Sequence, residues 1–132
     1  TRAATEPLAS RITMAGELAG DPLDRAYDNA ALFVLPTYYE GYGMVIGEAI
    51  ARALPVVSTP TGAIADIVGD DAGVLVQAGD AAALAGALER LLTDAAELAR
   101  LRAGAARRRP TLPTWDDACR QMEAVLVQAA GR

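Results

Sequence analysis

Three short apolar runs stand out between residues 31 and 77, and each is followed by turn-forming residues. They cover residues 31–35, 56–59 and 74–77. Continuous apolar runs of this length are typical of strands buried on both faces of a parallel sheet. Between the first two runs lie a glycine-containing loop and a helical pattern from Met44 to Ala53. This order of strand, loop, helix and strand predicts a crossover unit in an α/β sheet.

Helical periodicity and capping residues predict further helices around this unit. Asp21 and Pro22 suit the cap and first position of a helix that runs to about Asn29. A short helix covers residues 62–68, and Asp80 and Asp94 are placed to cap two longer ones. The apolar positions of the longer helices recur at helical spacing; they are Leu84, Leu88, Leu91 and Leu92, then Leu98, Leu101 and Ala105. Helices thus alternate with the predicted strands and continue beyond them.

The two ends of the chain complete the prediction. Thr114 and Asp117 resemble a capping box, with Asp in place of Glu, at the start of a last helix. Its apolar residues fall on one face, which we expect to contact the core; they are Trp115, Ala118, Met122, Val125 and Leu126. Residues 11–15 alternate as a short strand, and residues 1–10 suit the tail of a preceding helix or loop. The prediction is therefore about four strands and six helices in one domain.

Composition excludes several kinds of chemistry. The 132 residues contain no histidine and one cysteine, Cys119, so neither Ser-His-Asp nor Cys-His catalysis nor a zinc site is expected. Lysine is also absent, which excludes the phosphate-binding Gly-Lys-Ser/Thr loop. The net charge of −5 argues against nucleic acid as a partner. No Asp-x-Asp pair occurs, so we expect no metal, and no apolar run reaches membrane length.

The loop before the central helix carries the candidate ligand-binding residues. Glu40 precedes the glycine pair Gly41 and Gly43, and Glu48 lies on the helix that follows. Ligands of parallel sheets sit beyond the carboxyl ends of the strands, where this loop lies. The glycines let a ligand approach the backbone, and the helix N-terminus favours a phosphate. The carboxylates suit hydroxyl pairs of a sugar or ribose. The alternative is an acid that favours the helix dipole plus a solvated glutamate, and spacing alone does not separate the two.

The same residues carry a resemblance to a known family. Glu40-Gly-Tyr-Gly43, Met44-Val-Ile-Gly47, Glu48-Ala49 and Leu54-Pro-Val-Val57 are similar to the donor-binding region of family 4 retaining glycosyltransferases of the GT-B fold. That family carries two glutamates separated by seven residues, and Glu40 and Glu48 match this spacing. The similarity runs from about residue 11 to residue 115. The resemblance implies a Rossmann-like parallel sheet flanked by helices, the truncated C-terminal half of a GT-B enzyme.

The resemblance also implies roles for the residues of the loop. Glu40 lies near hydroxyls of the donor sugar and is the catalytic candidate, and Glu48 lies near the ribose of the nucleotide. The other expected substrate-binding residues are Gly41, Tyr42, Gly43, Met44 and Val45. We expect a side chain at Gly43 to intrude on the ligand and so to impair function more than folding. No metal or cofactor is implied.

The implied activity is retaining transfer of a hexosyl group from a UDP-, GDP- or ADP-sugar to an acceptor hydroxyl. Residues 1–132 are then a partial nucleotide-sugar-binding domain whose partner, the N-terminal acceptor-binding domain, is absent. We expect this fragment alone to be inactive and the protein to be cytoplasmic. The resemblance is compatible with membrane association of the full chain. In the resembled family the last helix packs back on that partner domain.

Two alternatives remain: a GT-B-like binding or regulatory module without transfer activity, and a GT-B sugar-nucleotide epimerase. The paired glutamates speak against the epimerase. The chain also departs from the family's pattern at three places. Arg52-Ala53 stands where the family usually has Cys-Gly, Gly47 where it has a larger apolar residue, and Tyr42 where it more often has Phe.

Overall fold

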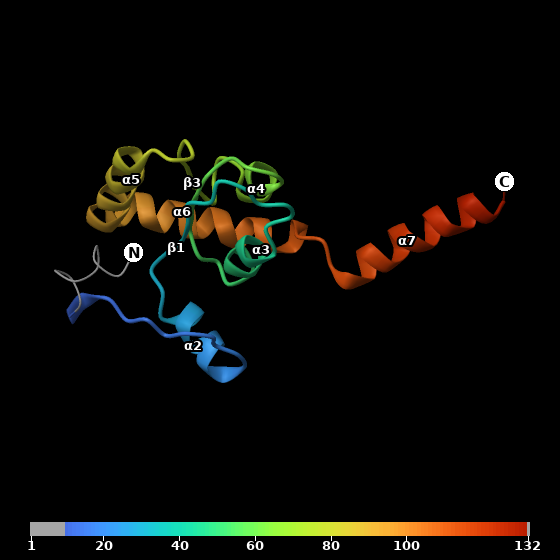
Figure 1. Ribbon diagram of the computed structural model, residues 1–132, viewed down its shortest axis with the longest axis horizontal. Helices are drawn as coiled ribbons and strands as arrows, with labels where there is room; N and C mark the ends of the chain where they lie inside the picture. Colours follow the sequence, from blue (N-terminus) through green and yellow to red (C-terminus); the bar gives the residue numbers. More distant parts are fainter. Residues whose placement is uncertain (1–9, 132) are drawn as a thin grey trace.

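The computed structural model describes residues 10–131 and shows a three-stranded parallel sheet flanked by helices (Figure 1). The strands are β1 (Phe33–Leu35), β2 (Val56–Ser58) and β3 (Gly73–Leu75), in the order β1-β2-β3. Phe33 is paired with Val56, and Val56 with Gly73. The predicted α/β class and the crossover unit are therefore confirmed, and each predicted apolar run contains or overlaps one of the strands.

Side chains of β2 alternate between two cores, one on each face of the sheet. Val56 and Val57 are both fully buried, and they belong to different apolar clusters. The cluster around Val56 includes side chains of helices α2 (Asp21–Asp28), α3 (Met44–Ala51) and α4 (Ile64–Val68). The cluster around Val57 includes side chains of α5 (Ala81–Thr93) and α6 (Ala95–Arg108). Because β2 is central and covered on both faces, its run has no polar side chain before Ser58.

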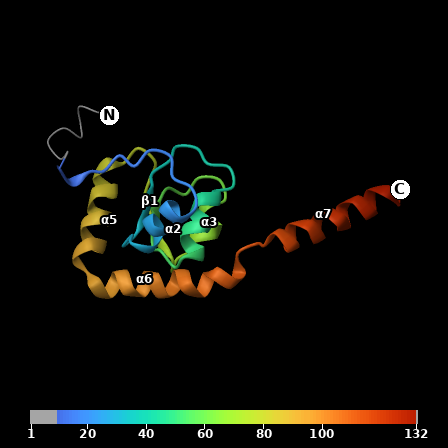
Figure 2. The same cartoon turned by 90° about the horizontal axis from the view of Figure 1, so that it is seen from below.

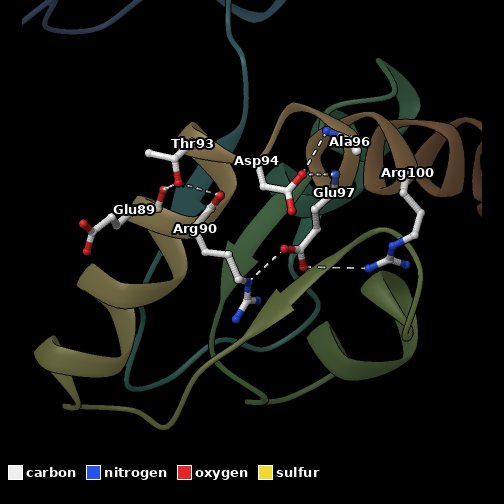
Figure 3. A network of polar contacts seen from close by, with 7 residues as sticks. All are labelled: Glu89, Arg90, Thr93, Asp94, Ala96, Glu97 and Arg100. Atoms are coloured by element: carbon white, nitrogen blue, oxygen red, sulfur yellow. Dashed lines mark hydrogen bonds and ion pairs between the residues drawn. The ribbon is translucent and has the colours of Figure 1, made fainter.

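Side-chain caps fix where α5 and α6 begin. The Asp80 carboxylate accepts from the Ala83 N–H at 2.8 Å. Asp94 accepts from the N–H groups of Ala96 and Glu97 at 3.0 and 2.9 Å, at the corner between the two helices (Figure 3). The same corner carries an ion pair in which Arg90 Nε lies 2.9 Å from Glu97 Oε2. Both predicted caps are confirmed, because an Asp side chain satisfies N–H groups that have no partner inside the helix.

The arginines at the end of α6 have structural partners. Arg108 donates to the carbonyl oxygens of Ile67 and Asp66, at 3.1 and 2.8 Å, at the end of α4. Arg107 lies 3.3 Å from the carboxylate of Asp71. The chain then passes through a 3-10 turn, η2 (Arg109–Thr111). These cations suit the negative end of a helix, here α4 as well as their own.

Several predicted boundaries are wrong. The strand predicted at residues 11–15 is not formed, so the described sheet has three strands rather than four. Ile12 and Met14 are exposed, and no described segment pairs with them. Gly20, not Asp21, is the N-cap of α2, and α3 ends at Ala51 rather than Ala53. The third strand begins at Gly73, earlier than its apolar run. The prediction for residues 1–9 lies outside the described residues.

The last helix, α7 (Trp115–Ala130), departs most from expectation. Its capping box is present, because Thr114 Oγ1 accepts from the Asp117 N–H and Asp117 accepts from the Thr114 N–H. The helix nevertheless projects away from the sheet and has no buried residue (Figure 2). Trp115 is 86% exposed and Leu126 is 60% exposed. The prediction that this apolar face contacts the core is therefore wrong, since no described part of the chain reaches it.

None of the described helices is both long enough and apolar enough to cross a membrane.

Candidate functional site

The candidate site is built on the loop that joins β1 to α3, beyond the carboxyl ends of the strands. Two buried hydroxyl groups from the end of β2 hold this loop. Ser58 Oγ donates to the Leu35 carbonyl at 2.7 Å, and Thr59 Oγ1 donates to the Thr37 carbonyl at 2.6 Å. Both side chains are buried, so these bonds satisfy polar groups that water does not reach. The loop is thereby fixed to the sheet at its start.

A second loop supports the residues around Glu40. An added Cβ at Gly62 would lie 2.0 Å from the Glu40 carbonyl oxygen and 2.5 Å from that of Gly41. The Ala63 N–H donates to the Gly41 carbonyl at 3.2 Å. Gly62 also has φ +55°, a conformation that favours glycine. The close packing of the two loops therefore depends on Gly62, whose role was not predicted from the sequence.

Gly43 is the N-cap of α3 and has left-handed backbone angles, φ 76° and ψ 42°. The Glu40 carboxylate folds back on this turn, with Oε1 accepting from the Gly43 N–H at 3.2 Å. An added Cβ at Gly43 would meet the side chains of Ile64 and Ile46 at 3.5–3.7 Å. It would point toward these two core side chains. The left-handed backbone conformation by itself disfavours a side chain at Gly43. The predicted intrusion of such a side chain on a ligand stays a prediction.

The outer side of the same turn is open. Tyr42, Met44 and Val45 are exposed, and no side chain caps the N-terminus of α3 among the described residues. A Cβ at Gly41 or Gly47 would meet nothing within 4 Å. The first N–H groups of a helix have no internal partner, so this end of α3 is free to bind an anion.

Glu48 lies on the exposed side of α3, and its surroundings differ from those of Glu40. Its Oε2 accepts a hydrogen bond from the Tyr27 phenol at 3.0 Å. Arg52, one turn further along, lies over the Tyr27 ring, 4.5 Å from its centroid, and is paired with Asp24 at 2.5 Å. The pKa of Arg52 is raised, chiefly by this hydrogen bond with Asp24. The role of Tyr27 was not predicted from the sequence, because no local pattern relates it to Glu48, 21 positions later.

A hollow of about 180 Å³ lies beyond the carboxyl ends of all three strands. Its lining residues come from the loops that follow the strands and from the start of α5; they are Pro36, Tyr38, Thr59, Val76, Gln77, Gly79, Asp80, Ala81 and Leu84. Neither Glu40 nor Glu48 lines it. The implied binding of one nucleotide sugar by both glutamates is therefore not tested by this hollow and stays a prediction.

Comparison with known proteins identifies the family. A family model described as glycosyl transferases group 1 matches residues 1–94, more than half of the chain. The chain belongs to the group 1 glycosyltransferases. The resemblance read from Glu40, Glu48 and their neighbours is therefore confirmed at the level of the family.

Individual glycosyltransferases agree with this assignment. The chain is 37% identical to a D-inositol 3-phosphate glycosyltransferase of Salinispora tropica over 115 residues, which are 86% of this chain and 24% of that protein. It is 43% identical over 75 residues to the capsular polysaccharide biosynthesis glycosyltransferase CapM of Staphylococcus aureus, covering 56% of this chain and 20% of that one.

A solved structure supports the fold as well. The sucrose-phosphate synthase of Thermosynechococcus elongatus superposes with a TM-score of 0.87 at 31% identity, covering 98% of this chain and 33% of that chain. The Rossmann-like GT-B architecture is thereby confirmed. The glycosyltransferase chain described here spans between a fifth and a third of the length of these relatives.

One departure from the family's pattern has a visible structural consequence. Ala53 has φ 55°, and it is the one non-glycine residue with positive φ in residues 10–131. It stands where the family usually has glycine, just after Arg52, the C-cap of α3. A left-handed conformation costs a residue with a Cβ about 1–2 kcal/mol. The exit from α3 is therefore strained here in a way that a glycine would relieve.

Proposed function

We propose that this chain is the nucleotide-sugar-binding part of a retaining glycosyltransferase. Its donor is a UDP-, GDP- or ADP-sugar, and it requires no metal or cofactor. The bond from the anomeric carbon to the diphosphate breaks, and a bond to the acceptor oxygen forms on the same face. The proton of the acceptor hydroxyl passes to the phosphate oxygen from which the sugar departs, and the nucleoside diphosphate leaves.

The placement of the two glutamates around the start of α3 carries this proposal. Glu40 lies in the loop before the helix, and Glu48 lies on the helix itself. The axial rise from Gly43 to Glu48 is roughly 7 Å for an ideal helix. Two carboxylates on either side of an uncapped helix N-terminus can hold two hydroxyl-bearing parts of a ligand whose phosphates lie between them. A nucleotide sugar has this order of groups.

Each group of the site then has a role. Glu40 uses one oxygen on the Gly43 N–H, and its second oxygen accepts from a hydroxyl of the donor sugar, beside the reacting carbon. The N–H groups of Met44 and Val45 and the dipole of α3 meet the diphosphate and stabilise the charge that develops as it leaves. Glu48 accepts from the ribose hydroxyls, while Gly41 and Tyr42 border the sugar.

The described residues leave this site incomplete. The chain contains no lysine, and Arg52 is engaged by Asp24 and Tyr27, so neither of these supplies a free cation to the diphosphate. The outer edge of β1 also has no strand paired with it among residues 10–131. We infer that upstream strands and an N-terminal acceptor-binding domain complete the sheet and the site. The 132-residue chain alone is then expected to transfer no sugar.

The names of the relatives point to no common acceptor, because one refers to D-inositol 3-phosphate and another to capsular polysaccharide.

The test is calorimetric titration of the full-length protein with UDP, GDP and ADP, comparing Glu48→Ala with Glu48→Gln. Loss of a hydrogen bond to a charged group corresponds to roughly tenfold or more in affinity. We expect the alanine variant to lose at least this much, and the glutamine variant less because it keeps one acceptor oxygen. Glu89→Ala, an exposed glutamate on α5, is the matched control. Equal and unchanged affinities for both Glu48 variants would return Glu48 to the role of a solvated side chain.

A further inference from the structure

Tyr27 joins the core of the domain to Glu48. Its side chain belongs to the buried cluster on the α3 face of the sheet, and the residue is only 8% exposed. Its phenol oxygen lies at the edge of this cluster and donates to Glu48 Oε2 at 3.0 Å. Glu48 itself is exposed, and within residues 10–131 its carboxylate accepts this hydrogen bond from Tyr27. The conformation of a solvent-facing glutamate is therefore restrained by a buried residue 21 positions earlier.

The Tyr27 ring is held by neighbours of different kinds. Phe33 of β1 stacks against it with 6.1 Å between ring centroids and 21° between planes. The Arg52 guanidinium lies over the ring at 4.5 Å, within the range of a cation–π contact. Asp24 holds that guanidinium in turn. The phenol hydroxyl thus has little freedom to turn away from Glu48.

The hydrogen bond leaves Glu48 able to bind a ligand. A carboxylate has two oxygens and about four acceptor positions, and Tyr27 occupies one of them. Burial, and next the hydrogen bond with Glu48, hold the pKa of Tyr27 above its usual value of 10.0, although Arg52 opposes this. The phenol therefore keeps its proton at neutral pH and remains a donor. A phenylalanine in its place would fill the same space and donate nothing.

We infer that Tyr27 is a positioning residue that orients the Glu48 carboxylate toward the ribose hydroxyls of the nucleotide donor. The inference rests on the proposed role of Glu48. A side chain that binds through one rotamer loses affinity when the residues that hold this rotamer are removed. Arg52 and Asp24 act one step further away, by holding the ring. This chain has Arg52 where the family usually has cysteine, so this part of the arrangement departs from the family's pattern.

The experiment measures affinity for the ribose rather than for the nucleotide as a whole. Full-length protein is titrated with whichever of UDP, GDP and ADP binds, and with the 2′,3′-dideoxy form of the same diphosphate. The variants are Tyr27→Phe, Glu48→Ala and the double variant. Tyr27→Phe is expected to weaken binding of the ribonucleotide about threefold to tenfold and to leave the dideoxy ligand unchanged. The double variant is expected to bind no more weakly than Glu48→Ala alone.

The outcomes separate the two proposals. Tyr27 is a packing residue only, and the inference is overturned, if Tyr27→Phe weakens both ligands equally or neither. The proposed function then stands as long as Glu48→Ala weakens binding of the ribonucleotide more than binding of its dideoxy form. No binding of any diphosphate, or no effect of Glu48→Ala, overturns both. If Tyr27→Phe fails to fold, Arg52→Met replaces it, because this variant frees the ring and keeps the hydroxyl. It must lower the ratio of the affinity for the ribonucleotide to the affinity for its dideoxy form. An unchanged ratio overturns the inference.

Discussion

Helices α6 and α7 are similar in length and in how they begin, yet only one of them is packed. They contain 14 and 16 residues, and each starts at a side chain that accepts from backbone N–H groups of its first turn. Helix α6 runs along the domain with Leu101 and Ala105 fully buried. Helix α7 projects from the domain with every residue exposed or half-buried (Figures 1 and 2). The same local signals thus lead to two different environments.

This difference shows what the local signals determine. Capping and apolar spacing act within a few residues, so they specify that a helix forms and where it begins. Burial requires a partner surface that comes from elsewhere in the fold. Leu101 of α6 has one, in a cluster with Val57 and Leu91. The apolar side chains of α7, among them Val125 and Leu126, have none in the part of the chain that the structure describes.

The largest expected effect comes from truncating one leucine in each helix. In the 132-residue chain, Leu101→Ala should lower the free energy of unfolding by about 2–5 kcal/mol, because it removes a fully buried side chain and leaves a cavity. Leu126→Ala should change it by less than about 0.5 kcal/mol, as is usual for exposed positions. Urea unfolding followed by circular dichroism measures both. Similar losses for the two variants would mean that α7 is packed in solution, and the comparison would fail.

A second and smaller effect concerns how closely α6 approaches the domain. A Cβ at Gly104 would lie 1.8 Å from the Asp71 carbonyl oxygen, so Gly104→Ala must push α6 away from the turn before β3. Strain of this kind costs about 1–3 kcal/mol. Gly86→Ala in α5 is the matched control, because its Cβ meets nothing within 4 Å. Alanine is the better helix former by about 1 kcal/mol, so this control should be stabilised.

Thermal midpoints of these two glycine variants are expected to move in opposite directions. A rise in both would show that α6 has room to shift, and that its close contact with the Asp71 turn contributes little to stability.

Much of the fold followed from the sequence because its signals were local. The runs around β1 and β2, the Asp80 and Asp94 caps and the Thr114–Asp117 capping box needed no knowledge of distant contacts. The strand expected at residues 11–15 failed for the opposite reason, since a strand exists only where another strand pairs with it. The burial expected for α7 failed in the same way.

The candidate site shows the same division. Its loop could be located, because glycines and acids beyond a strand are visible in the sequence. The residues that support it could not be predicted, since Gly62 and Tyr27 act across gaps of about 20 positions. The direction in which a Cβ at Gly43 would point could not be predicted either, because it depends on how α3 packs against α4. The strain at Ala53 was indicated only by the missing glycine.

The smallest expected effect separates helix formation from packing within α7 itself. The pKa of Asp117 is lowered, first by the Thr114 backbone N–H, then by the Thr114 hydroxyl and by Arg120. A lowered pKa means that the carboxylate stabilises the helix above the ordinary value of 3.8, and that this contribution is lost as the pH falls through the lowered value. Acidification should therefore loosen the first turn of α7. Cα chemical shifts of Trp115, Asp116 and Asp117 report this directly.

Thr114→Ala removes the hydroxyl half of the capping box and should reduce the helical shifts of that turn at neutral pH. The unfolding midpoint of the sheet domain should stay unchanged, because no residue of α7 is buried against it. Asp117→Asn removes the carboxylate of the capping box and is the control for acidification, so its Trp115 Cα shift should change less than that of the unsubstituted protein. A midpoint that falls together with the α7 shifts would show that α7 and the domain unfold as one unit, and that the exposed helix has a partner surface after all.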